Sequence, residues 1–258
     1  MKIIALVENT CQSGAFSVEH GLSLYIETNN HKILFDAGQT ALFAENAKKL
    51  GVNLQAVDAL VLSHGHYDHG GGLEPFLKLN SQAPVYLSKL AFCACYNGSE
   101  KYIGLDSALK NNARLVFVDD THVIDKGITL STQNDKTRKF NMQSAGLTVC
   151  KNGSFLPDDF CHEQYLLIEE DGKRILFSGC SHKGILDIAD WFCPDVLIGG
   201  FHFSKLPLDE TLAEYARMLD AHKTVFYTCH CTGTEQFAYM KKHMRHLHYL
   251  STGDSIVI

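Results

Sequence analysis

The sequence predicts a single α/β domain over residues 1–258, built as a four-layer α/β/β/α sandwich with two facing sheets and helices on their outer sides. Three observations predict this fold. Each half of the chain contains short strands joined by tight turns. Strands and helices then alternate towards the C-terminus. No proline-rich, glycine-serine or low-complexity linker divides the chain, so both sheets are expected to share one domain.

The first half is predicted to open with an antiparallel run of strands. Asn29-Asn30 supplies a turn between the second and third strands, and Gly51 ends the helix that follows them. The predicted elements are strands at 2–8, 22–28 and 32–35, a helix at 40–50, a strand at 59–63, a helix at 73–79 and a strand at 84–87. The less patterned stretch near 97–112 resembles a surface insertion.

The second half is predicted to form a second antiparallel run, with Asp171-Gly172 as a hairpin turn, followed by alternating strands and helices. The predicted strands lie at 128–132, 147–150, 165–169, 174–178, 195–199 and 224–227. The predicted helices lie at 183–192, 209–222 and 234–246. In the last helix, the basic cluster 241–246 is interpreted as a solvated face.

Composition excludes several classes of protein. With 45% hydrophobic and 20% charged residues, the chain is too apolar for disorder, and it contains no stretch of about 18 apolar residues that could span a membrane. A net charge of -6 argues against nucleic acid or an anionic membrane surface as a partner. Nine cysteines, an odd number, favour reduced thiols and a cytoplasmic location. A small-molecule substrate is therefore expected.

Three histidines and an aspartate lie within six residues, directly after the predicted buried strand at 59–63: His64, His66, Asp68 and His69. Imidazole and carboxylate are the ligands that Zn²⁺, Fe²⁺ and Mn²⁺ prefer. In an extended segment His64 and His66 project to the same side, while Asp68 and His69 can turn towards a second ion. Structural zinc sites usually contain sulfur, so this set favours a catalytic metal site.

These residues resemble the metallo-β-lactamase superfamily, whose hallmark is His-x-His-x-Asp-His after a buried strand. More narrowly, the chain resembles the branch named after 7,8-dihydropterin-6-yl-methyl-(β-D-ribofuranosyl)aminobenzene 5′-phosphate synthase. The segments that carry this second resemblance are Glu19-His20-Gly21-Leu22-Ser23, Phe35-Asp36-Ala37-Gly38, Leu62-Ser63-His64-Gly65-His66, Gly179-Cys180-Ser181-His182, Gly199-Gly200-Phe201-His202 and His230-Cys231-Thr232-Gly233. The resemblance implies an αββα sandwich with one or two divalent transition metals, zinc first and iron or manganese as alternatives.

The resemblance also implies further metal ligands at strand ends. His182 and His230 occupy suitable positions, and His162 competes with His182 as the third histidine. Where the family usually has a bridging aspartate, this chain has Cys180. A thiolate there could bind metal, or His182 could replace it.

Three other residues are candidates for supporting or catalytic roles. Asp36 is expected to accept a hydrogen bond from a ligand histidine, or to form a turn. His20 could reach the pocket. His202 could contact the substrate or transfer a proton, or hydrogen-bond a ligand.

The predicted function is hydrolysis of a small, anionic or phosphorylated metabolite by a metal-activated water, with Asp68 as both ligand and proton acceptor. No Gly-x-Ser-x-Gly elbow or phosphate-binding glycine loop is present, which argues against serine hydrolases and nucleoside triphosphatases. Two alternatives remain open: an iron-binding redox or oxygen-handling protein, and a metal-dependent sensor without turnover.

Overall fold

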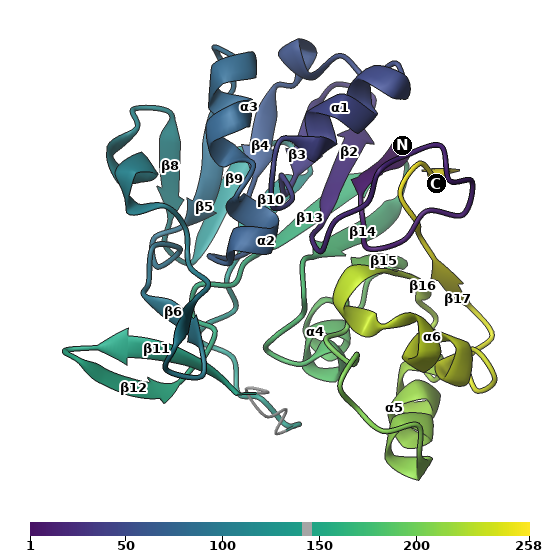
Figure 1. The fold of residues 1–258 in the computed structure, drawn as a ribbon. Helices are drawn as coiled ribbons and strands as arrows, with labels where there is room; N and C mark the ends of the chain where they lie inside the picture. The colour runs from purple at the N-terminus through teal and green to yellow at the C-terminus, as the bar shows by residue number, and fades with distance from the viewer. Residues whose placement is uncertain (141–145) are drawn as a thin grey trace.

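Two seven-stranded sheets form the body of the computed structural model, which describes residues 1–140 and 146–258 (Figure 1). The first sheet has the order β18 (Ser255–Val257), β1 (Lys2–Val7), β2 (Ser23–Glu27), β3 (Lys32–Phe35), β4 (Ala59–Val61), β5 (Val85–Ser88) and β8 (Leu115–Val118). The second has the order β17 (Leu247–Tyr249), β16 (Val225–Thr228), β15 (Val196–Gly199), β14 (Lys173–Ser178), β13 (Tyr165–Glu170), β10 (Ile128–Ser131) and β9 (Thr121–Asp125).

Alternation along the strands divides the core into layers. Ile3 and Ala5 of β1 pack between the two sheets, whereas Ile4 and Leu6 pack on the opposite face beneath helices. The helices on the first sheet are α1 (Leu42–Lys49) and α3 (Leu73–Leu79), and those on the second are α4 (Ile185–Phe192), α5 (Glu210–Asp220) and α6 (Thr234–Met240). The predicted four-layer fold is confirmed.

A third, four-stranded sheet was not predicted. Its order is β12 (Ser154–Pro157), β11 (Leu147–Lys151), β6 (Cys95–Asn97) and β7 (Lys101–Tyr102), and Figure 1 shows β11 and β12 projecting from the body. The prediction that 147–150 joins the second sheet is therefore wrong. Leu147 and Val149 instead pack with Cys95, Ile103 and Phe160 in a separate small core. The stretch 97–112, which was predicted as a surface insertion, contains β7 and a 3-10 turn at Ser107–Asn111.

The C-terminal segment also differs from the prediction. Helix α6 ends at Met240, and 241–246 forms turns, so the helix predicted through 246 is too long. The chain leaves the helix because Phe226 donates a backbone hydrogen bond to His246 and Leu247 is buried in β17. Strand β18 then pairs with β1, which brings the two termini together. Strands β8 and β9 were missed as well, since they lie at sheet edges and bury few side chains.

The sheet topology concentrates chemistry at one edge of the sandwich. Strands β3 and β4 run parallel, as do β14, β15 and β16, so the carboxyl ends within each group lie together. Asp36, His64, Cys180, His202 and His230 all lie within a few residues after those ends. No helix in the described residues is long and apolar enough to cross a bilayer.

Candidate metal centre

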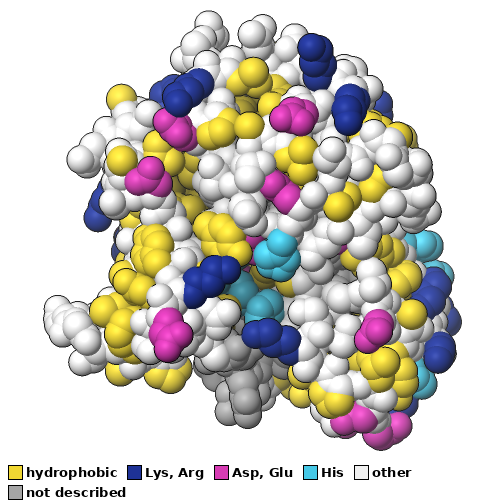
Figure 2. Space-filling model, viewed as in Figure 1, with side chains coloured by type: hydrophobic (Ala, Val, Ile, Leu, Met, Phe, Trp, Pro, Cys, Tyr) yellow, Lys and Arg dark blue, Asp and Glu magenta, His cyan; other side chains and the backbone are white. Residues whose placement is uncertain are grey.

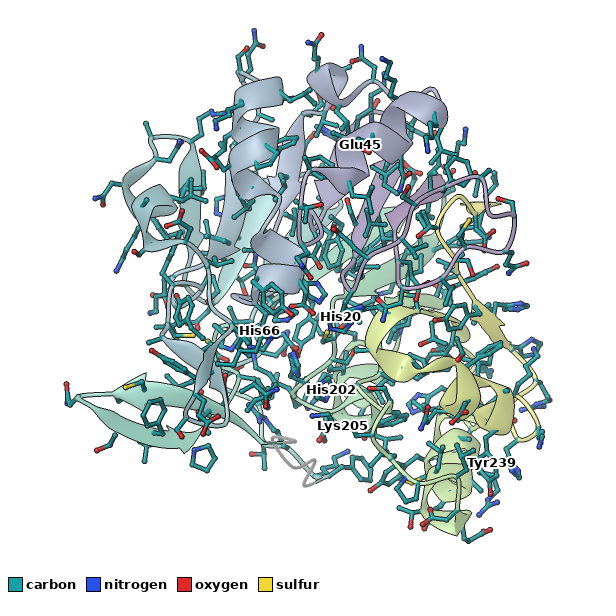
Figure 3. The ribbon with its side chains drawn as sticks, in the orientation of Figure 1. His20, Glu45, His66, His202, Lys205 and Tyr239 are labelled. Atoms are coloured by element: carbon teal, nitrogen blue, oxygen red, sulfur yellow. The ribbon has the colours of Figure 1, made fainter. Side chains whose placement is uncertain are left out.

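The predicted ligands gather between the two sheets at this edge. They come from the loop after β4, the short helix α2 (Tyr67–Gly70) and the loops after β14 and β16. All seven are buried: His64, His66, Asp68, His69, Cys180, His182 and His230. Figure 3 shows His20, His66 and His202 directed towards this region, whereas Glu45 and Tyr239 lie far from it.

The loops that carry the site are held in an uncommon backbone conformation. Asp36, Ser181, His202 and His230 have positive φ values of 59°, 56°, 55° and 49°. Non-glycine residues adopt this region rarely, and such positions cluster at functional sites. Gly179 is required for a different reason, because a Cβ there would lie 2.2 Å from Ser63 Oγ. These backbone conformations direct the side chains of the turns into the site.

Asp36 fixes the orientation of two histidines. Its Oδ2 accepts hydrogen bonds from His69 Nδ1 at 2.6 Å and from Ser63 Oγ at 2.7 Å. Because the Ser63 hydroxyl has one proton, which goes to Asp36, Ser63 Oγ accepts from His64 Nδ1 at 2.8 Å. In the neutral form, both histidines therefore carry the proton on Nδ1 and present Nε2 as an acceptor.

A second network orients His230. Its Nδ1 donates to Asn9 Oδ1 at 2.8 Å, and its backbone N–H donates to the buried carboxylate of Glu8 at 2.6 Å. His230 Nε2 is therefore also an acceptor. It lies 3.2 Å from His69 Nε2 and 3.3 Å from Asp68 Oδ2.

This convergence of acceptors requires a cation. Neutral His69, neutral His230 and ionised Asp68 would all direct lone pairs at the same space. Without a metal ion, a second proton on His69 would supply this positive charge. Burial opposes the charged form of His69, but the carboxylates of Asp36 and Asp68 outweigh burial and raise the pKa of His69 to about 9. A divalent metal ion would displace that proton, so the donor set fits a metal.

A neighbouring group is formed by His64, His66 and His182, whose ligand atoms lie within 4.8 Å of one another. His64 Nε2 and His182 Nε2 are 3.3 Å apart. His66 Nε2 and His182 Nδ1 are buried without a hydrogen-bond partner among the described residues. Burial lowers the pKa of all three histidines, which keeps them neutral and able to bind metal. The backbone N–H of His182 donates to Glu163 Oε2 at 2.7 Å, which fixes the loop.

His162 lies beside His66 but is engaged elsewhere. Gly65 N–H donates to His162 Nδ1 at 3.0 Å, so the neutral ring carries its proton on Nε2. That nitrogen lies 3.1 Å from Asp158 Oδ2 and is therefore a donor. Because both nitrogens are used, the geometry favours His182 over His162 as the third histidine.

Two sulfur atoms lie beside the group formed by Asp68, His69 and His230. Cys180 Sγ is 3.2 Å from His69 Nε2, and the ligand atoms of Cys180, His230 and Cys231 lie within 4.8 Å of one another. Burial and the neighbouring Cys231 raise the pKa of Cys180 in the metal-free chain. A borderline divalent ion such as Zn²⁺ would stabilise the thiolate.

The side chain of Asn9 also determines the role of His20. Gly21 N–H donates to Asn9 Oδ1, so Asn9 Nδ2 is the atom that faces His20 Nδ1 at 3.3 Å. His20 then carries its proton on Nε2, which donates to Asp68 Oδ2 at 3.3 Å. The side-chain amide of Asn9 thus makes His230 Nε2 an acceptor and His20 Nε2 a donor.

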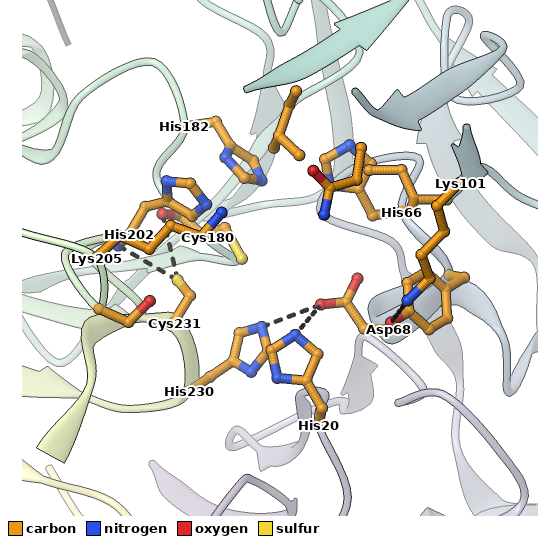
Figure 4. Close-up of a pocket in the computed structure, with 15 residues that line it drawn as sticks. His20, His66, Asp68, Lys101, Cys180, His182, His202, Lys205, His230 and Cys231 are labelled. Atoms are coloured by element: carbon orange, nitrogen blue, oxygen red, sulfur yellow. Dashed lines mark hydrogen bonds and ion pairs between the residues drawn. The ribbon is translucent and has the colours of Figure 1, made fainter. Parts of the chain in front are cut away.

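A cavity of about 350 Å³ opens over the site (Figure 4). His202 lines it, with its ring centroid 4.4 Å from that of His182. Burial and then the charge of Lys205 lower the pKa of His202 to about 4, so the ring is neutral at pH 7. Figure 2 shows histidine side chains at the floor of a hollow with Lys or Arg side chains beside them.

Sequence reasoning missed several residues of this site. Asn9 acts through His20 and the distant His230. Ser63 acts through the adjacent His64 and through Asp36. Neither side chain is itself a typical metal ligand. Cys231 belongs to a segment that carries the family resemblance, but it was not named as a ligand. The signal for it was its position beside His230 after a parallel strand.

Known proteins are similar to this chain in sequence and in fold. Residues 17–222 match the family described as the metallo-beta-lactamase superfamily. The uncharacterised protein MJ0448 of Methanocaldococcus jannaschii is 31% identical over 237 residues, which cover 88% of this chain and 89% of that protein. A second M. jannaschii protein, named 7,8-dihydropterin-6-methyl-4-(beta-D-ribofuranosyl)-aminobenzene-5'-phosphate synthase, is 28% identical over 261 residues, 90% of this chain and 88% of that protein.

A solved structure extends the agreement to the whole fold. Tm1679, described as a metal-dependent hydrolase of the beta-lactamase superfamily, superposes with a TM-score of 0.85 at 30% identity, covering 100% of this chain and 99% of the other. Both resemblances inferred from the motifs, to the superfamily and to its dihydropterin synthase-like branch, are confirmed. The chain belongs to the metallo-beta-lactamase superfamily.

Proposed function

We propose that this protein is a metal-dependent hydrolase that acts on a small anionic or phosphorylated metabolite. The observation that carries the proposal is the convergence of His69 Nε2, His230 Nε2 and Asp68 Oδ2, three acceptors that need a shared cation. A divalent ion bound there would lower the pKa of water and polarise the bond under attack. The resemblance to Tm1679, described as a metal-dependent hydrolase, supports the same reaction class.

The chain's own residues would contribute in three ways. Asp68 lines the pocket, and its carboxylate can accept a proton. Neutral His202 can donate one hydrogen bond to an anionic group of the substrate. His20 holds Asp68 through Nε2 and lies more than half exposed at the pocket mouth, with 57% of its side chain accessible.

Zinc is the proposed metal, because imidazole, thiolate and one carboxylate form a donor set that suits Zn²⁺ better than Mn²⁺. Iron remains compatible with the histidines and the aspartate. All nine cysteines are free thiols, which supports a reducing compartment and hence the cytoplasm. The cavity volume of about 350 Å³ supports a small molecule as the substrate.

A second candidate is a group-transfer reaction at the same site. It is favoured by one observation: a relative that shares 28% identity is named a synthase. Such a reaction would use the same residues with an organic acceptor in place of water.

Turnover tests the proposal. We expect the zinc-loaded protein to hydrolyse members of a panel of small phosphate esters, phosphodiesters, carboxylic esters and thioesters, and chelation to abolish this activity until zinc is restored. Activity that survives chelation would contradict the proposal. Turnover that requires an organic acceptor and does not occur in water alone would favour the transfer reaction.

A further inference from the structure

The walls of the pocket present two lysines that the metal centre does not use. Figure 4 shows Lys101 and Lys205 on opposite sides of the pocket, with Asp68 between them. Neither ammonium forms an ion pair with a carboxylate in the part of the chain that the structure describes. Lys101 Nζ donates to Tyr67 Oη at 3.5 Å and lies 5.2 Å from the centroid of the Tyr67 ring. Asp68, the one carboxylate of the lining, accepts a hydrogen bond from His20 and faces His69 and His230.

One wall is a cross-strand row of the small sheet. Leu147 of β11 pairs with Asn97 of β6, and Asn97 pairs with Lys101 of β7. Residues directly opposite one another share a face of the sheet, and all three line the pocket. The row is tied to the metal-binding loop because Tyr67 N–H donates to Ile103 O at 2.9 Å.

The other wall is the loop after β15. Ser204 N–H donates to Cys231 O at 3.0 Å, and Gln236 Nε2 donates to Ser204 O at 3.2 Å and to Leu206 O at 2.9 Å. These bonds hold the backbone on both sides of Lys205. Ser204 and Lys205 both line the pocket. Each wall thus offers an uncharged hydrogen-bonding side chain and an ammonium on an anchored backbone.

We propose that this site takes an organic molecule with an anionic group at each end, one group held by Lys101 with Asn97 and the other by Lys205 with Ser204. This rests on the proposed function, because it names the substrate class of the same site. The middle of such a molecule would lie over the metal centre. The small sheet, which lies outside the two-sheet sandwich, would then determine specificity.

Binding of two matched ligands to the zinc-loaded protein tests the proposal. The ligands are 3-phosphonopropionate, which is anionic at both ends, and propylphosphonate, which is anionic at one. The wild type is expected to bind the first about tenfold more tightly, a preference that weakens as salt is added. Lys101→Met and Lys205→Met should each abolish the preference with metal content unchanged. The control is Lys110→Met, which removes an exposed lysine outside the pocket and should bind like the wild type.

Equal binding of the two ligands by the wild type, or an intact preference in both lysine variants, would overturn the proposal. The measurement is independent of turnover. If the preference is present but no ester is hydrolysed, the hydrolase assignment fails and the recognition of two anionic groups holds. If esters are hydrolysed but the wild type binds the two ligands equally well, the recognition of two anionic groups fails and the hydrolase assignment holds.

Discussion

Replacing His182 with alanine is expected to remove most of the bound metal, whereas replacing His162 with alanine is expected to leave it in place. His182 Nε2 lies 3.3 Å from His64 Nε2, while both ring nitrogens of His162 are committed to Gly65 and Asp158. Changing residues that only orient ligands lowers metal affinity by about 10- to 100-fold. Removing the ligand His182 itself should therefore lower metal affinity by at least about 100-fold.

The two variants form a matched pair, because both histidines are buried and only 20 positions apart in the sequence. His162→Ala removes a buried partner of the Gly65 N–H and should lower the free energy of unfolding by about 1–3 kcal/mol. Equilibrium dialysis with zinc, alongside a denaturation curve, separates the two effects. Metal depletion in His162→Ala with full occupancy in His182→Ala would reverse the assignment.

Replacing Asp36 with asparagine is expected to weaken metal binding by about 10- to 100-fold, although every metal ligand remains in place. Asp36 accepts from Ser63 N–H and Ser63 Oγ as well as from His69 Nδ1. An asparagine has one acceptor oxygen, so its NH₂ group would face at least one of these donors. His69 would lose its fixed orientation, and His64 would be affected through Ser63.

Asp158→Asn is the matched control, since Asp158 is another buried aspartate paired with a histidine. We expect it to reduce stability but to leave zinc affinity close to that of the wild type. Competition with a chromogenic chelator measures both affinities. Equal loss of affinity in the two variants would show that Asp36 acts through general stability and not through the metal ligands.

The layers of the fold could be predicted because strands such as β1, helices such as α4 and the turns between them are recognised from neighbouring residues. The small sheet could not be predicted, because Leu147 of β11 pairs with Asn97 of β6, which is far away in the sequence. The residues of β11 also look like those of a strand in a main sheet. The C-terminal helix was overextended because Met244 continues the helical spacing of Phe237 and Met240, whereas pairing of Leu247 with β16 makes the next segment a strand.

The candidate site shows the same division. Side chains with their own metal chemistry, such as His64 and Asp68, could be named from their spacing. Asn9 and Ser63 could not, because an amide or a hydroxyl has no preference for metal sites until the fold places it beside an imidazole. Lys101 was hidden in a stretch without a readable pattern, and only the register of β6 and β7 directs it to the pocket.

Elemental analysis of the protein after zinc reconstitution and gel filtration tests the metal centre most directly. The convergence of His69, His230 and Asp68, next to the group of His64, His66 and His182, predicts one or two zinc ions per chain. A paired His64→Ala, His69→Ala variant with a native far-UV spectrum should retain almost none. Wild-type protein that holds no zinc, manganese or iron after reconstitution would contradict the metal centre and the function built on it.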